Sequence, residues 1–278
     1  MSDKSLYPQC CPFCSGLDYK TIFEYSNPDQ YEQQLGITSD SYYRSWVECS
    51  SCGLIYSVYS RSEDLIHKIY TNDYRSASSE WRSESSKDKF ERIINLSYKE
   101  SETKQRVTWI KDHLHSLNII GGKCLDIGGG SGVFAYEFSS GGWKASVLDP
   151  DTHNSYLAGY GISVINSYLT DSTVFESKFN FVSLVFVLEH INKPQTFLNY
   201  ACSALEENGY LFVEVPSSNS ISCRDKHDDV FNSCHLTLFN EKTLSMLAES
   251  CGLELVIVDE YTTMRNYLSL RALLRLPL

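Results

Sequence analysis

Short apolar runs alternate with longer amphipathic stretches through the second half of the chain. The apolar runs predict buried strands at Lys123–Ile127, Ala145–Asp149, Ile162–Ile165, Phe181–Val187, Tyr210–Val215 and Leu253–Asp259. The stretches between them favour helices, and this alternation is typical of a mainly parallel sheet covered by helices on both faces. We therefore predict a doubly wound α/β domain over residues 121–278.

The segments at the two ends of this alternating pattern have patterns of their own. Asn266–Arg271 alternates apolar and polar residues, which predicts an antiparallel final strand, whereas the leucines that follow it favour a short amphipathic helix as the alternative. Upstream, Phe90–Leu117 carries apolar residues at helical spacing, which predicts helices packed beside the sheet. Ser76–Lys89 is rich in serine and charge, which predicts an exposed linker or flap.

A glycine-rich segment follows the first predicted strand of this domain. Gly128, Gly130 and Gly132 have G-x-G-x-G spacing, which permits a tight turn and lets a ligand touch the main chain. The dinucleotide-binding fingerprint would need a further glycine at Val133. The second predicted strand ends in Asp149, where a carboxylate is placed to hold a ribose diol through two charge-assisted hydrogen bonds. Together these features predict a nucleoside-binding α/β domain.

Two C-x-x-C pairs stand out in the first sixty residues. Cys11 and Cys14 form the first pair, and Cys49 and Cys52 form the second. Four thiolates suit a tetrahedral Zn²⁺ ion, and a set with no position left for water is structural. Cys10 adjoins the first pair and is an alternative ligand to Cys11. The competing interpretations are four unconnected thiols or a redox pair, although no βαβ pattern surrounds either pair.

Composition narrows the class of partner and the compartment. The 278-residue chain carries a net charge of −11, which argues against nucleic acid or an anionic membrane as the main partner. It contains neither an apolar run long enough to cross a bilayer nor a signal-peptide pattern at residues 1–30. We expect a cytoplasmic protein with a zinc-ribbon module at residues 1–60, a linker and helical segment at 61–120, and the α/β domain at 121–278.

Three segments between Gly121 and Tyr261 occur in a characteristic order: Leu125–Gly132, then Leu188–Ile191 with Pro194 and Phe197-Leu198, then His235-Leu236 with Phe239, Leu244 and Gly252-Leu253. With these segments the chain resembles the class I S-adenosylmethionine-dependent methyltransferases. The cysteine module, ending in Cys52-Gly53-Leu54-Ile55-Tyr56, resembles the amino-terminal module of a subgroup that includes C-methyltransferases of nucleotide-linked keto sugars. Those sugar enzymes usually carry a further carboxy-terminal α/β domain, and we expect this protein to differ from them in that respect.

The resemblance implies a Rossmann-like, seven-stranded methyltransferase sheet that binds S-adenosylmethionine. It places the cofactor's amino-acid part against Asp126, Gly128 and Gly130, and its ribose against Asp149. The remaining cofactor-binding positions that it implies are Pro150 and Tyr168 beside the adenine and Val187 at the end of the fourth predicted strand. The implied cofactors are thus S-adenosylmethionine and a structural Zn²⁺ ion.

Methyl transfer also requires an acceptor held in line with the sulfonium and, for a hydroxyl or acidic C–H group, a base. Our first candidate for the base is His235, because histidine titrates near neutral pH. This residue lies between the fifth predicted strand, Tyr210–Val215, and the next helix. Glu214 and His190 are the alternatives. The alternative role for His235 is structural: it would hold its loop against the sheet. The alternative role for His190 is to contact the cofactor or to begin a helix. Asp228 and Asp229 either hold acceptor hydroxyls or form a solvated acidic turn.

The sequence thus predicts methyl transfer to a small polar acceptor. A sugar or nucleotide-linked sugar, in surface-glycan or secondary-metabolite biosynthesis, is the leading substrate class, with the oligomeric state open. One alternative is an RNA or protein methyltransferase whose zinc ribbon reads the macromolecule; a basic stripe at Arg44, Arg61, Arg75 and Arg82 would support it. A second alternative is a non-catalytic binding protein that keeps the cofactor-binding fold. A third is an NAD-dependent oxidoreductase, which the spacing of the glycines disfavours.

Overall fold

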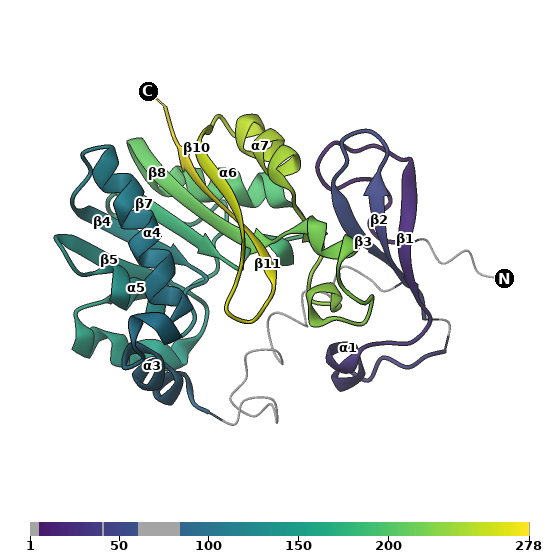
Figure 1. Ribbon diagram of the computed structural model, residues 1–278, viewed down its shortest axis with the longest axis horizontal. Helices are drawn as coiled ribbons and strands as arrows, with labels where there is room; N and C mark the ends of the chain where they lie inside the picture. The colour runs from purple at the N-terminus through teal and green to yellow at the C-terminus, as the bar shows by residue number, and fades with distance from the viewer. Residues whose placement is uncertain (1–5, 41, 61–83, 278) are drawn as a thin grey trace.

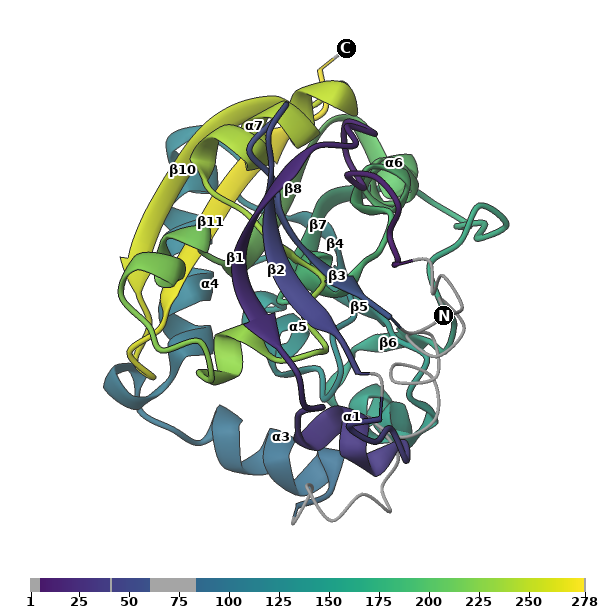
Figure 2. The ribbon, with the colours of Figure 1, turned by 90° about the vertical axis from the view of Figure 1, so that its right-hand side faces the viewer.

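The computed structural model describes residues 6–40, 42–60 and 84–277. Its strands form a seven-stranded sheet and a separate four-stranded sheet, which lie side by side in Figure 1. Turning the molecule brings strands β1 to β3 of the smaller sheet in front of the larger one (Figure 2). The predicted α/β class, with a small amino-terminal module beside the main sheet, is confirmed.

The large sheet has the strand order β10-β11-β8-β7-β4-β5-β6. Its strands are β4 (Gly122–Ile127), β5 (Trp143–Leu148), β6 (Ser163–Ile165), β7 (Phe179–Val185), β8 (Leu205–Pro216), β10 (Glu254–Thr262) and β11 (Leu268–Arg275). The five strands from β8 to β6 pair in parallel, whereas β11 is antiparallel to both of its neighbours. The end of the chain is therefore a strand, and the alternative of an amphipathic helix is wrong.

Helices cover both faces of this sheet (Figure 1). One face carries α3 (Ser86–Ile94), α4 (Glu102–Ser116) and α5 (Val133–Phe138), and the other carries α6 (Pro194–Ala204) and α7 (Glu241–Ser250). The central strands are mostly apolar because both of their faces are buried. Asp126 on β4, Ser183 on β7 and Glu214 on β8 are buried polar exceptions. In the core, the rings of Phe138 from α5 and Phe181 from β7 stack with centroids 4.5 Å apart. The described residues also form short 3-10 helices: η2 (Tyr98–Glu100), η3 (Thr152–Tyr160), η4 (Leu188–His190), η5 (Ser218–Ser222) and η6 (Asp229–Phe231).

The small sheet draws on both halves of the chain. Its order is β1-β2-β3-β9, with β1 (Tyr19–Tyr25), β2 (Arg44–Cys49), β3 (Ile55–Tyr59) and β9 (Thr237–Leu238). The short helix α1 (Gln30–Gln34) connects β1 to β2. Its fourth strand thus lies outside the predicted module of residues 1–60. Because β9 begins two residues after His235, the small sheet and the predicted catalytic segment are one connected structure.

Some sequence-based expectations fall outside the described residues. The segment 61–83 contains Arg61, Arg75 and Arg82 of the basic stripe considered above, together with part of the predicted flap at Ser76–Lys89. Within the described ranges, no helix combines the length and the apolar character needed to cross a membrane.

Candidate active site

The glycine loop after β4 leaves room for a ligand at its centre. Gly128, Gly130 and Gly132 have φ angles of +71°, +53° and +74°, a left-handed conformation that side chains with a Cβ rarely adopt. A Cβ on Gly128 would lie 2.7 Å from Cγ2 of Val187, so Val187 closes the loop on one side. A Cβ on Gly130 would meet nothing within 4 Å. The loop therefore presents open backbone at Gly130.

Asp149 ties this loop to the end of β5. Its Oδ2 accepts a hydrogen bond from the N–H of Gly130 at 2.9 Å, and its Oδ1 accepts one from the N–H of Asp151 at the same distance. Each carboxylate oxygen has a second lone pair, so a ribose hydroxyl can add to these bonds. The predicted position of Asp149 beside the glycine loop is what the structure shows.

Asp126 lies beneath the same loop. Its side chain is buried, and Oδ1 accepts a hydrogen bond from the hydroxyl of Ser183 at 2.7 Å. Within the described residues, Oδ2 has no hydrogen-bond donor. Burial raises the pKa of Asp126 to about 7, although the Ser183 hydroxyl works in the opposite direction. A buried carboxyl oxygen without a donor fits a site completed by a cationic or N–H-bearing ligand.

Two asparagines hold the backbone of the glycine loop at Gly130, and the sequence patterns did not predict them. Buried Asn154 donates to the carbonyl of Gly130 at 3.3 Å, and Asn166 donates to Oδ1 of Asn154 at 3.1 Å. Neither belongs to a pattern that would single it out, because asparagine is common in loops. Of the predicted adenine neighbours, Pro150 is half-buried beside Asp149, and Tyr168 is exposed on the segment after β6.

A cluster of ionisable side chains lies near this loop, at the carboxyl end of β7. Phe186 has a φ of +54°, a strained angle for a non-glycine residue, at the point where the chain leaves β7 for η4. Glu189 and His190 follow on η4, and His235 reaches them from the loop before β9. One ligand-type atom of each of these three residues lies within 4.8 Å of the others. Two of the three predicted catalytic residues are therefore neighbours.

The comparisons with known proteins agree with this geometry. A family model described as a methyltransferase domain matches residues 80–258, which is more than half of the chain. The chain belongs to this methyltransferase family. It is a class I S-adenosylmethionine-dependent methyltransferase. No match was found among curated proteins.

Solved structures with the same fold include methyltransferases of diverse substrates. One is 1,6-didemethyltoxoflavin-N1-methyltransferase from Burkholderia thailandensis, with a TM-score of 0.51 at 16% identity over 63% of this chain and 78% of that one. Magnesium protoporphyrin IX methyltransferase from Synechocystis has a TM-score of 0.50 at 16% identity, covering 62% and 82%. A putative sarcosine dimethylglycine methyltransferase from Galdieria sulphuraria reaches 0.52 at 14% identity, covering 67% and 91%. At these identities the likeness concerns the fold.

The third predicted catalytic residue of the methyltransferase lies in a different environment. The Glu214 carboxylate on β8 is fully buried and receives two hydrogen bonds from the guanidinium of Arg106, at 2.5 and 2.7 Å. The hydroxyl of Tyr261 donates a third at 2.7 Å. Since these donors already satisfy the carboxylate, it holds α4 against the sheet, and we do not carry Glu214 into the proposed function.

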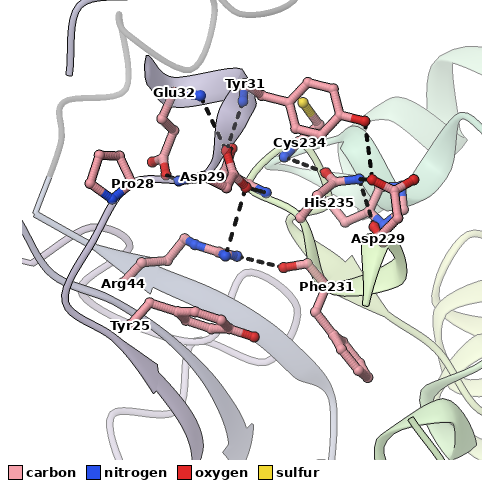
Figure 3. A network of polar contacts seen from close by, with 12 residues as sticks. Tyr25, Pro28, Asp29, Tyr31, Glu32, Arg44, Asp229, Phe231, Cys234 and His235 are labelled. Carbon is pink, nitrogen blue, oxygen red and sulfur yellow. Dashed lines mark hydrogen bonds and ion pairs between the residues drawn. The ribbon is translucent and has the colours of Figure 1, made fainter. Parts of the chain in front are cut away.

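The amino-terminal module holds the loop that carries His235 (Figure 3). Arg44 on β2 is buried and donates to the carbonyl of Phe231 at 2.8 Å, while its guanidinium lies over the ring of Tyr25. Asp29, the N-cap of α1, accepts hydrogen bonds from the N–H and hydroxyl of Ser233. Arg44, considered above as part of a basic stripe, is therefore engaged in holding this loop.

A polar cavity lies at the same junction. It has a volume of about 560 Å³ and is bordered by Tyr25, Asp29, Arg44, Lys226, Asp228 and Asp229, among others. Asp228 pairs with Arg224 at 3.1 Å, whereas exposed Asp229 receives a hydrogen bond from the hydroxyl of Tyr31, also at 3.1 Å. The acidic turn at residues 228–229 therefore lines a cavity instead of projecting freely into solvent.

The four predicted metal-binding cysteines meet at one end of the small sheet. The Sγ atoms of Cys11 and Cys52 are 3.6 Å apart, those of Cys14 and Cys49 are 3.5 Å apart, and all four lie within 4.8 Å of one another. Burial alone would raise the pKa of Cys49, but hydrogen bonds from the backbone of Cys52 and Ser51 bring it down to about 7. Cys10 lies outside this group. The four sulfurs have the number and proximity that a tetrahedral metal ion requires.

Proposed function

We propose that this methyltransferase transfers a methyl group from S-adenosylmethionine to a small polar acceptor, and that the acceptor is a sugar or nucleotide-linked sugar. The observation that carries the proposal is the proximity of two elements. Val187 packs on Gly128 of the glycine loop, and Glu189 and His190 lie two and three residues after Val187, beyond the carboxyl end of β7. In parallel α/β sheets, ligands bind at this end of the strands.

The residues of this chain fit the cofactor as follows. Asp149 would accept hydrogen bonds from the ribose hydroxyls, and the open backbone at Gly130 would approach the cofactor's amino-acid part. Oδ2 of Asp126, which has no hydrogen-bond donor among the described residues, would receive a hydrogen bond from the cofactor's amino-acid part, directly or through water. When bound, S-adenosylmethionine supplies a methyl group already activated by its sulfonium. The protein's task is then to hold the acceptor in line and to promote loss of its proton.

Glu189, His190 and His235 are the side chains that we assign to the acceptor. They come from two segments that only the tertiary fold brings together, and two of them are histidines, the residue type most used for proton transfer. The polar cavity beside the His235 loop supports a polyhydroxylated acceptor, because the amine of Lys226 and the carboxylates of Asp228 and Asp229 offer hydrogen-bond partners for hydroxyl groups. Its volume falls within the usual range for small-molecule sites.

The cysteine cluster would hold one Zn²⁺ ion with a structural role. Four thiolates complete a tetrahedral set and leave no position for water or substrate. The ion would stabilise the small sheet, whose strand β3 pairs with β9 directly after the His235 loop. The zinc site would thus act on the acceptor site through the position of that loop.

A methyl-transfer assay tests the proposal. The purified protein would be incubated with S-adenosylmethionine carrying a labelled methyl group and with a panel of nucleotide-linked sugars, including keto sugars. We expect label in one sugar class, and we expect His235→Ala to abolish that transfer while it still binds S-adenosylhomocysteine. If S-adenosylhomocysteine binds but label enters only RNA or protein, the sugar assignment is wrong. Full activity of His235→Ala would remove His235 from the acceptor site.

A further inference from the structure

The cluster at the end of β7 has the composition of a metal site. Glu189 and His190 are adjacent on η4, and His235 arrives from a segment more than forty residues later in the chain. The imidazole rings have centroids 5.0 Å apart, and Nε2 of His190 is 3.8 Å from Oε1 of Glu189. Two imidazoles and one carboxylate on neighbouring positions form a ligand set that leaves further coordination positions open.

Both histidines are oriented through the same ring atom. Nδ1–H of His190 donates to the carbonyl of Cys234 at 2.9 Å, and Nδ1–H of His235 donates to the carbonyl of Val230 at 2.7 Å. In this tautomer Nε2 carries the lone pair, which is the form that binds metal. A backbone carbonyl bound to the other ring nitrogen is the usual outer partner of a metal-binding histidine.

The carboxylate of Glu189 gives independent support. The residue is 1% exposed, and its Oε2 has no hydrogen-bond donor among the residues that the structure describes. Within the same part of the chain, no lysine or arginine forms an ion pair with it. A buried carboxylate left in this state is costly, and a bound cation removes most of that cost.

We propose that Glu189, His190 and His235 bind one divalent transition-metal ion, and that an oxygen atom of the acceptor completes its coordination. Mixed imidazole and carboxylate ligands favour Mn²⁺, Fe²⁺ or Zn²⁺ over Ca²⁺ or Mg²⁺. The ion would orient an acceptor hydroxyl or keto oxygen beside the glycine loop. This role of the ion rests on the proposed function, whereas the binding of the ion does not. His235 is then a ligand, which takes the place of the general-base role that its sequence position suggested.

Binding of Mn²⁺ to the full-length protein tests this site directly. Mn²⁺ prefers oxygen and nitrogen ligands over thiolates, so it reports on this cluster separately from the four cysteines. Free and bound Mn²⁺ would be counted by electron paramagnetic resonance. We expect one Mn²⁺ per chain, and more than about tenfold weaker binding in Glu189→Gln and in His235→Ala. Glu249→Gln and His115→Gln, which change exposed residues, are the matched controls and should bind as the wild type does.

Each result has a definite meaning. Failure of the wild-type protein to bind Mn²⁺, or unchanged binding in Glu189→Gln and His235→Ala, overturns the metal site. Calorimetric titration of the same samples with S-adenosylhomocysteine separates this from the proposed function. If the wild type binds S-adenosylhomocysteine but not Mn²⁺, only the metal proposal fails. If it binds Mn²⁺ but not S-adenosylhomocysteine, the metal site stands and the proposed function fails.

Discussion

The carboxylate of Asp29 accepts two hydrogen bonds from Ser233, one from the backbone N–H at 2.6 Å and one from the hydroxyl at 2.8 Å. Asp29 lies in the amino-terminal module, and Ser233 lies two residues before His235. The same carboxylate caps helix α1 by accepting from the N–H groups of Tyr31 and Glu32. One side chain therefore fixes both the start of α1 and the loop that presents His235.

We predict that Asp29→Ala impairs turnover more than cofactor binding. Loss of a helix cap costs about 1 kcal/mol, and loss of hydrogen bonds to a charged group costs about 1.5–3 kcal/mol more. The loop around Ser233 should then lose its fixed position, so kcat should fall while the affinity for S-adenosylhomocysteine stays unchanged. Asp18→Ala, at an exposed position in the same module, is the control. Equal kcat values for the two variants would show that Asp29 does not position His235.

The cysteine cluster makes a prediction about metal content. Cys49→Ser should lose the bound zinc measured by elemental analysis, and it should lower the midpoint of thermal unfolding because β2 and β3 lose their common anchor. Cys10→Ser should keep the zinc, since Cys10 lies outside the group of four. Loss of zinc from Cys10→Ser, with zinc retained in Cys49→Ser, would contradict the assignment of ligands.

The buried pair between Arg106 and Glu214 should behave as a structural unit. Arg106→Ala leaves the Glu214 carboxylate buried without its charge partner, which typically costs about 3–5 kcal/mol of unfolding free energy. Arg106→Met combined with Glu214→Leu should recover most of this loss, because an apolar pair has no charge to desolvate. Urea unfolding measures both effects. A double variant as unstable as Arg106→Ala would show that the charges themselves stabilise the fold.

Asp126 should give the ligand-free protein a pH-dependent stability. Its pKa rises from 3.8 to about 7 on folding because the carboxyl is buried. The folded state therefore binds more protons than the unfolded state between pH 4 and 7, and stability should decrease as the pH rises through that window. One pKa unit corresponds to about 1.4 kcal/mol, so the expected decrease is on the order of a few kcal/mol.

The matched variant for this prediction is Asp126→Asn. It retains an oxygen that can accept from the Ser183 hydroxyl but has no proton to lose, so this part of the pH slope should disappear. Thermal unfolding of both ligand-free proteins at several pH values between 4 and 8 provides the comparison. Identical slopes in the two proteins would mean that Asp126 is ionised throughout that range.

Sequence patterns predicted the large sheet well because parallel strands buried on both faces are almost uniformly apolar. The glycine loop and Asp149 were also found, since a strand, a glycine turn and a strand-terminal acid are close in the sequence. The spacing of Cys11, Cys14, Cys49 and Cys52 likewise predicted the group that the structure brings together. In each of these cases, the signal is local or depends on an unusual residue type.

The sequence patterns did not predict the contacts between segments that are far apart in the chain. β9 is only two residues long, too short for a periodicity, yet it joins the small sheet to the loop of His235. The partner of Glu214 is Arg106, more than one hundred residues earlier, so an acid that looked available proved to be paired. Asp29 begins a capping box with Glu32, a pattern that announces a helix but not its bond to Ser233.

We expect S-adenosylmethionine to bind at the glycine loop, with Asp149 holding its ribose. The most direct measurement is the dissociation constant for S-adenosylhomocysteine by isothermal titration calorimetry, in the wild type, in Asp149→Ala and in the exposed control Asp171→Ala. We predict one site per chain, unchanged affinity in the control, and a loss of about 1.5–3 kcal/mol in Asp149→Ala. That loss corresponds to binding about 10–150 times weaker. No binding by the wild-type protein, or equal affinity in wild type and Asp149→Ala, would contradict the account.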